Sequence, residues 1–202
     1  MSSYTTNAQT ELQAVNEILA SVGQAPVTTL DQTNPDVAIA YNTLQQVSRE
    51  IQAEGWTFNR EYEYPFTPDT NKNIVIPNNI LQLDLTPSYR DQDVVRRDGK
   101  LYDRTAHSYE FENEVKCDVV WYFDWVDLPT PIKDYIVARA ASVVSTRIVG
   151  DATQFQMLQQ REAYARAVAL EYECNQGDYT FFGHPRGANY YNSYEPFKAL
   201  YR

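Results

Sequence analysis

Histidine and cysteine, the residues that most often bind zinc, are scarce in this sequence. Its 202 residues include only two histidines, His107 and His184, and two cysteines, Cys117 and Cys174. These four residues do not have the spacing of a known zinc site. Cys117 falls in a strand pattern and Cys174 at a helix end, and we expect both to be buried free thiols. We therefore predict no metal and no cofactor.

Long hydrophobic runs and the loop motifs of common enzymes are also missing. No apolar run approaches the ~20 residues that span a bilayer, and residues 1–4 lack the basic and apolar regions of a signal peptide. Gly183 and Gly187 do not follow a strand and open a helix, as a phosphate-binding loop does. No serine lies in a nucleophile elbow. We expect no enzyme, no membrane insertion, and a chain that stays in a cytoplasm or is assembled there into something larger.

Positive charge is in the minority. The chain has 17 lysines and arginines against 27 aspartates and glutamates, a formal net charge of −10. An acidic surface does not neutralise phosphates, so tight sequence-independent binding to nucleic acid is disfavoured. The same charge does not exclude a wall that nucleic acid slides past without sticking, because like charges prevent adhesion.

Two N-terminal segments have the apolar periodicity of amphipathic helices. The first begins at Thr10, with Gln13 as its capping-box partner, and ends at Gly23. The second begins at Asn34, which is followed by a proline, and ends at Gly55. Both starts are local signals that predict helix boundaries directly.

The longest helical block is residues 130–175. We expect Thr130 as the N-cap before a proline at the first helical position. Gly150 ends this helix because glycine readily adopts the left-handed conformation at a helix C-terminus. Asp151 begins a second helix, which ends near residue 175.

Between the two helical pairs the period changes from helical to alternating. Pro65 indicates an edge strand, and Asp98-Gly99 fits a type I′ hairpin turn. Several short strands with turn signals between them predict a small antiparallel sheet or sandwich. The expected strands are residues 60–66, 74–76, 81–85, 94–97, 100–104 and 117–123.

The sequence thus predicts an α+β fold. Two N-terminal and two C-terminal helices form a helical bundle with an inserted small antiparallel β domain and an extended C-terminal arm. The bundle comprises residues 1–58 and 127–177, the β domain residues 59–126, and the arm residues 178–202.

Two sets of residues are candidates for binding protein partners. The C-terminal arm is rich in aromatic residues, which bury a large area with few rotatable bonds, and the expected hairpin is rich in basic residues. The hairpin cations have two readings, a charged edge that discourages strand addition or a contact for an acidic partner. The candidate residues are Tyr179, Phe181, Phe182, Tyr190, Tyr191, Tyr194, Phe197 and Tyr201 in the arm and Arg96, Arg97, Lys100 and Arg104 in the hairpin.

Several segments, over about residues 8–176, together resemble one family. They are Glu11–Gly23 followed by Ala25-Pro26-Val27 and Thr29-Leu30, then Ile51-Gln52, Gly55-Trp56-Thr57-Phe58-Asn59, Tyr102-Asp103-Arg104-Thr105 and Glu171-Tyr172-Glu173. The pattern resembles the tail tubular protein A family, the head-to-tail adaptors of short-tailed bacteriophages. The match is poorest beyond Gly177.

The resemblance implies a structural protein of the virion tail, assembled in the host cytoplasm. It implies a twelve-subunit ring between the portal protein and the tail nozzle protein, with tail fibre proteins docking nearby. Double-stranded DNA would pass through the ring without specific binding during ejection.

Two other functions remain open at this point. Tyrosines and the carboxylates Glu110, Glu112 and Glu114 motivate a glycan-binding or cell-wall-degrading virion component, although nothing in the sequence pairs these carboxylates across a pocket. The other alternative is a free-standing cytoplasmic helical regulator.

Overall fold

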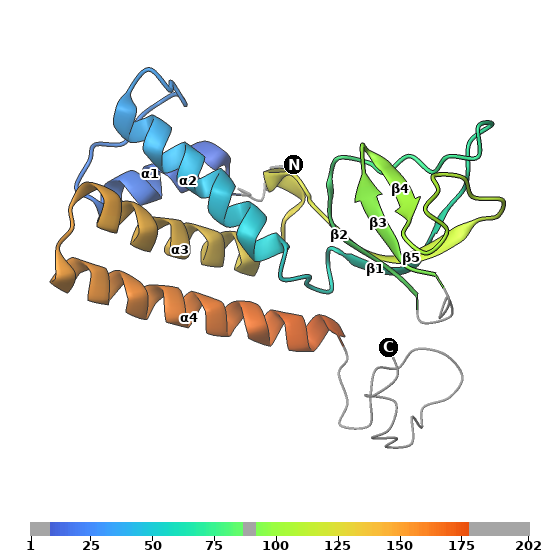
Figure 1. Ribbon diagram of the computed structural model, residues 1–202. Coiled ribbons are helices and arrows are strands. Elements are labelled where there is room, and N and C mark those ends of the chain that lie inside the picture. Colours follow the sequence, from blue (N-terminus) through green and yellow to red (C-terminus); the bar gives the residue numbers. More distant parts are fainter. Residues whose placement is uncertain (1–8, 87–91, 178–202) are drawn as a thin grey trace, which may run out of the picture. The chain divides into compact units, whose positions relative to one another are not determined.

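The computed structural model describes residues 9–86 and 92–177, and these have the α+β fold that the sequence predicted (Figure 1). The described chain divides into two compact units. Unit 1 contains residues 9–54 and 123–173, and unit 2 contains residues 55–86, 92–122 and 174–177. The elements in chain order are α1 (Glu11–Ser21), α2 (Pro35–Gln52), β1 (Arg60–Phe66), β2 (Ile80–Leu85), β3 (Val94–Arg97), β4 (Lys100–Asp103), β5 (Val115–Trp121), a 3₁₀ turn (Trp125–Asp127), α3 (Thr130–Ile148) and α4 (Ala152–Gly177).

Helices α1 and α2 begin where the sequence predicted. The Thr10 hydroxyl accepts a hydrogen bond from the Gln13 N–H at 3.2 Å, and the Gln13 side chain accepts one from the Thr10 N–H at 2.9 Å. This is the expected capping box. At the start of α2, the Asn34 side chain accepts from the Asp36 N–H at 3.0 Å. The predicted apolar stripe of α2 is buried: Val37, Ala40, Leu44, Val47 and Ile51.

Helix α3 is the central helix of unit 1 and is buried on most of its circumference. The prediction of Thr130 as its N-cap was wrong. Pro129 occupies the cap, and its carbonyl accepts the first helical bonds, from Ile132 at 3.1 Å and Lys133 at 3.0 Å. A proline needs no N–H partner at this position, so the helix begins one residue earlier than expected.

Helix α4 lies alongside α3 but is far less buried (Figure 1). The predicted apolar face, which includes Phe155 and Leu158, is half-buried, and Ala169 on the same face is fully buried. Long polar side chains supply the remaining attachment. The Gln154 amide donates to the Ser21 carbonyl and Arg161 forms an ion pair with Glu17 of α1. Arg166 donates to the Tyr135 hydroxyl at 3.3 Å. The sequence placed the start of this helix at Asp151, and the structure places it at Ala152, with Asp151 accepting from the Thr153 N–H at 2.9 Å.

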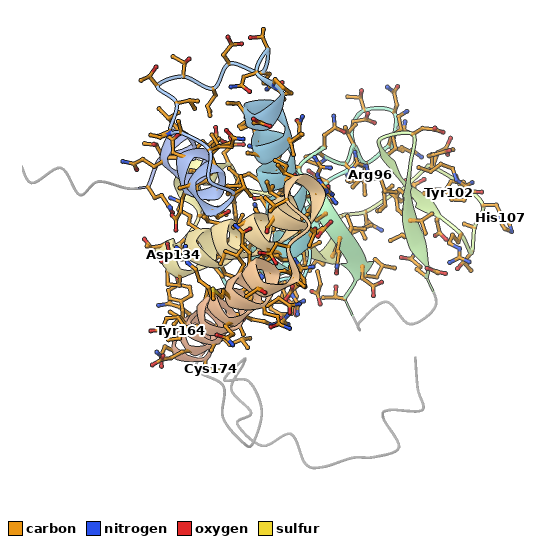
Figure 2. The ribbon with its side chains drawn as sticks, turned by 90° about the vertical axis from the view of Figure 1, so that its left-hand side faces the viewer. Arg96, Tyr102, His107, Asp134, Tyr164 and Cys174 are labelled. Atoms are coloured by element: carbon orange, nitrogen blue, oxygen red, sulfur yellow. The ribbon has the colours of Figure 1, made fainter. Side chains whose placement is uncertain are left out.

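Asp134 lies where α4 meets the rest of unit 1 (Figure 2). Desolvation and then the Glu17 carboxylate raise its pKa, and Arg161 opposes them. An aspartate with a raised folded-state pKa contributes stability that is complete below its unfolded pKa and lost as the pH rises through the folded value. Its charge therefore costs stability at neutral pH.

We expect Asp134→Asn to raise the free energy of unfolding at pH 7 by a few tenths of a kcal/mol, because this carboxylate is largely exposed. At pH 3.5, near the ordinary pKa of aspartate, the gain should vanish. Urea unfolding at both pH values measures this, with the exposed Asp124→Asn as control. A loss of stability at pH 7 would show that the carboxylate is needed for the Glu17–Arg161 contact instead.

Unit 2 contains two small antiparallel sheets. One has the strand order β1-β5-β2, and the other is the β3-β4 hairpin. Strand β1 is at an edge, as Pro65 predicted. The expected alternation of β1 breaks between Glu61 and Tyr64, where Glu63 has a φ of 54° and the register shifts. This bulge leaves Tyr64 36% exposed although its ring packs edge-on against Trp121 at 5.2 Å.

The strands expected at residues 81–85 and 100–104 differ from the structure by one residue at one end, and two other expected strands differ more. Residues 74–76 form only an isolated bridge, in which Val75 pairs with Lys100. This bridge still buries Ile74 and Ile76 while leaving Val75 62% exposed. The last strand covers Val115–Trp121 rather than residues 117–123. The core of this unit consists of Phe66, Ile74, Ile76, Ile80, Val94, Leu101, Phe111, Val115, Cys117 and Val119.

Candidate partner-binding surface

The β3-β4 hairpin carries three of the four predicted basic residues, and its turn is the one the sequence indicated. Asp98 and Gly99 both have positive φ angles, 53° and 71°, as a type I′ turn requires. The register pairs Arg97 with Lys100 and Arg96 with Leu101. Because side chains alternate between faces, Arg96 belongs to one face of the hairpin and Arg97 and Lys100 to the other.

The face with Arg96 is largely turned into the core. Val94 and Leu101 on this face are buried, 5% and 0% exposed. Arg96 itself is exposed near the turn and donates to the Asn78 side chain at 2.6 Å (Figure 2). The partner of Arg96 in this hydrogen bond is neutral, so the contact does not neutralise the charge of the arginine.

The opposite face combines cations with aromatic rings. The Arg97 guanidinium lies 4.2 Å from the centre of the Tyr102 ring, a cation–π contact. The Tyr102 ring packs edge-on against Tyr109 at 4.8 Å, and the Tyr109 hydroxyl donates to Asp98 at 3.2 Å. Desolvation and this hydrogen bond raise the pKa of Tyr109. We call the group Arg97, Asp98, Lys100, Tyr102 and Tyr109 the hairpin patch.

Arg104 does not belong to the hairpin patch. Its guanidinium forms an ion pair with Asp93 at 3.0 Å, and both side chains are more than half exposed. The structure thus brings together Arg97 and Lys100 but separates them from Arg96 and Arg104. With acidic residues interleaved, the hairpin lacks the single basic cluster that binds phosphates, and its aromatic rings suit contact with a protein.

One of the carboxylates before β5 is engaged in an ion pair. Glu112 is paired with Lys72 at 2.6 Å, and this contact raises the pKa of the lysine. Across residues 9–86 and 92–177, no three His, Cys, Asp or Glu side chains gather as metal ligands would. The glycan-binding or cell-wall-degrading alternative based on Glu110, Glu112 and Glu114 stays a prediction.

The two cysteines differ from each other. Cys117 is a buried free thiol, as expected, and desolvation raises its pKa to about 12, so it remains protonated at neutral pH. Cys174 was also expected to be buried, and this was wrong, because it lies on an exposed side of α4 (Figure 2).

The other predicted binding residues, Tyr179, Phe181, Phe182, Tyr190, Tyr191, Tyr194, Phe197 and Tyr201, lie outside the described residues. So does the predicted arm of residues 178–202. Among the helices of the described ranges, none is long and apolar enough to cross a membrane.

The segments that carried the family resemblance contain side-chain amides that act like an extra peptide group. Asn16 donates to the Val27 carbonyl at 2.9 Å and accepts from its N–H at 2.7 Å. Asn59 accepts from the Trp56 N–H and donates to the Trp121 carbonyl, both at 2.8 Å. These residues fix chain segments that are distant in sequence, so they serve the architecture.

Gln52 acts in the same way within unit 1. This side chain is fully buried. It donates to the Phe123 carbonyl at 3.1 Å and to the Ser48 hydroxyl at 3.0 Å, and it accepts from the Phe123 N–H at 2.8 Å. Sequence reasoning missed this role, because a glutamine gives no local signal of a backbone partner far along the chain. We call Asn16, Gln52 and Asn59 the amide clamps.

Comparison with known proteins adds to this picture. The model of a family described as "Tail tubular protein" matches residues 12–179. A protein named "Tail tubular protein A" from Klebsiella phage KP34 is 29% identical over 167 residues, which cover 82% of this chain and 88% of the relative. The matched range includes all three amide clamps and the hairpin patch.

Proposed function

Because this chain belongs to the tail tubular protein family and is a structural component of a bacteriophage tail, we propose that it forms the adaptor ring that joins the portal to the tail nozzle. The family match over residues 12–179 is the observation that carries this proposal. In this role the chain acts through the surfaces it offers to other copies and to its neighbours.

The charge of the chain supports a place on the path of DNA. With a net charge of −10, a ring of such subunits would repel double-stranded DNA rather than hold it, and ejection needs passage without adhesion. We propose a ring of about twelve copies, as the family resemblance implies. Assembly would take place in the cytoplasm of the host bacterium.

We propose a separate role for each of the domains that the sequence predicted. The helical bundle, residues 1–58 and 127–177, would build the ring wall. The arm, residues 178–202, would reach the portal or a neighbouring copy, and the inserted β domain, residues 59–126, would face the nozzle and the tail fibres. The aromatic rings of the hairpin patch and their surrounding charges support this last assignment.

Binding to the portal tests the adaptor role. The purified full chain is mixed with portal rings of the same phage and the mixture is sedimented through a gradient. The chain should move with the portal at about one copy per portal subunit. If it stays at the top of the gradient at all ratios, the adaptor proposal is wrong.

The hairpin patch should act in a later step. We expect Arg97→Glu combined with Lys100→Glu to leave portal binding intact and to lower nozzle attachment about tenfold, because the change removes the cation–π contact and reverses the charges of exposed Arg97 and half-buried Lys100. Pull-down of the nozzle protein by portal–adaptor complexes measures this. Lys116→Glu, an exposed change elsewhere in unit 2, is the control. Equal nozzle recovery with both variants would remove the patch from the interface.

A further inference from the structure

Helix α4 has a long outward side that carries little charge. Opposite its packed face, Met157 is 66% and Tyr164 73% exposed. At 100° per residue, Met157, Gln160, Tyr164, Ala167 and Glu171 fall on this side, and among them only Glu171 is charged. Burial of this side in the assembled protein would explain apolar side chains at these positions.

Helix α2 has a matching side. Its outward positions are Pro35, Ile39, Asn42, Gln46 and Arg49, of which only Arg49 is charged, and Ile39 is 38% exposed. Glu50, next to Arg49 on α2, forms an ion pair within unit 1 with Arg139 of α3 at 3.7 Å.

The two sides carry opposite charges that are left over within the subunit. Across the described ranges, neither Arg49 nor Glu171 has an ion pair. In unit 1, α3 separates the main lengths of α2 and α4, which lie on opposite sides of it (Figure 1). Two different faces on opposite sides of one subunit give a head-to-tail contact, and such a contact forms a ring when the rotation between neighbours closes.

We propose that the outward side of α4 in one copy binds the outward side of α2 in the next copy, with Glu171 paired to Arg49. This inference rests on the proposed ring and names its subunit contact. The outward side of α4 contributes the negative charge of Glu171 and that of α2 the positive charge of Arg49, so the contact brings no like charges together.

The spacing of the residues favours parallel helices. With Arg49 opposite Glu171, the same direction along both helices sets Asn42 opposite Tyr164. Ile39 then lies between Met157 and Tyr164, so that an exposed aliphatic side chain packs among exposed apolar partners. An antiparallel pair would instead carry the apolar half of α2 past the end of α4.

The size of the contact predicts its strength. Each side is about 27 Å long and about 10 Å wide, so the pair buries on the order of 500 Å² in total. Stable interfaces bury roughly 1,200–2,000 Å². The contact is therefore weak by itself and becomes stable when neighbours are held side by side, as on a portal ring.

Disulfide trapping between copies tests the contact, because it detects weak association. The background is the full chain with Cys174→Ser, since Cys174 is exposed and Cys117 is buried. Chains with Asn42→Cys are mixed with chains that carry Tyr164→Cys, and the mixture is oxidised. In a control mixture, Gln24→Cys, at an exposed position, replaces Asn42→Cys. The yield of linked dimers should be at least tenfold higher in the first mixture than in the control. Circular dichroism confirms that each chain is folded. Equal yields from the two mixtures, or equal linking of the Tyr164→Cys chain to itself, would overturn the proposal.

Charge exchange provides the second test. Glu171→Arg should lower the yield of the linked dimer roughly fivefold. When both chains carry Arg49→Glu together with Glu171→Arg, the yield should be restored. Failure of the exchange to restore it would contradict the pair. Portal sedimentation separates this inference from the adaptor role: if wild-type chains bind portals and no dimer is trapped, only the contact is wrong. If dimers are trapped and portals are not bound, the adaptor role is wrong.

Discussion

A chain that lacks residues 178–202 should fold normally and be incorporated into virions at least tenfold less than the full chain. Unit 1 and the sheets of unit 2 have their own buried cores within residues 9–177, so the truncation removes none of the described packing. The segment that is lost carries eight of the predicted aromatic binding residues, which would bury a large area on a partner.

The matched control keeps the aromatic area of this segment. Changing Tyr190, Tyr191 and Tyr194 to phenylalanine removes only hydroxyl groups, and we expect incorporation within threefold of the full chain. Quantitative immunoblots of purified particles measure both variants, and thermal melts report folding. Equal incorporation of the truncated and full chains would show that the arm is not a binding element.

Gln52→Leu should lower the free energy of unfolding by about 2–4 kcal/mol. Leucine has a similar size but cannot satisfy the Phe123 N–H and carbonyl, which Gln52 contacts at 2.8 and 3.1 Å. The Ser48 hydroxyl also loses the hydrogen bond that the Gln52 amide donates to it at 3.0 Å. Buried polar groups left without partners account for most of the expected loss.

Gln45→Leu is the control for this prediction, because Gln45 lies on the same helix but is only half-buried and its side chain donates to Glu11. We expect a change below about 0.5 kcal/mol. Urea unfolding followed by circular dichroism measures both. A loss below 1 kcal/mol for Gln52→Leu would show that the clamp does not hold the two halves of unit 1 together.

Local signals made much of the fold predictable. The caps at Thr10 and Asn34 depend on side chains within three residues of the helix start. The type I′ turn likewise depends on its own two residues, Asp98 and Gly99. The cap of α3 was misplaced because prolines stand on both sides of Thr130, and either could begin the helix.

Features that depend on distant partners escaped prediction. The amide clamps Asn16, Gln52 and Asn59 each bind backbone that the sequence does not place nearby. The bulge in β1 depends on its pairing with β5, including the Glu63 N–H that donates to Asp118 at 3.0 Å. Burial of α4 depends on how closely it packs on α3, which periodicity does not reveal.

The candidate surface was predicted in composition but not in arrangement. Three of the four predicted hairpin cations lie on the β3-β4 hairpin, and Arg104 directly follows β4. Alternation then puts Arg96 on the face opposite Arg97 and Lys100, and Arg104 is paired with Asp93. The sequence does not show that Arg49 of α2 and Glu171 of α4 lack ion pairs within the subunit, because the ion pairs that engage the other charges are long-range contacts.

Electron cryomicroscopy of the intact phage particle tests the central claim most directly. The claim is that this chain works as a ring of identical subunits through which DNA passes. We expect its helical unit to fit density that forms a closed ring between portal and nozzle, with α2 of one copy against α4 of the next. Density for the chain at another place in the particle, or as isolated copies away from the DNA channel, would contradict it.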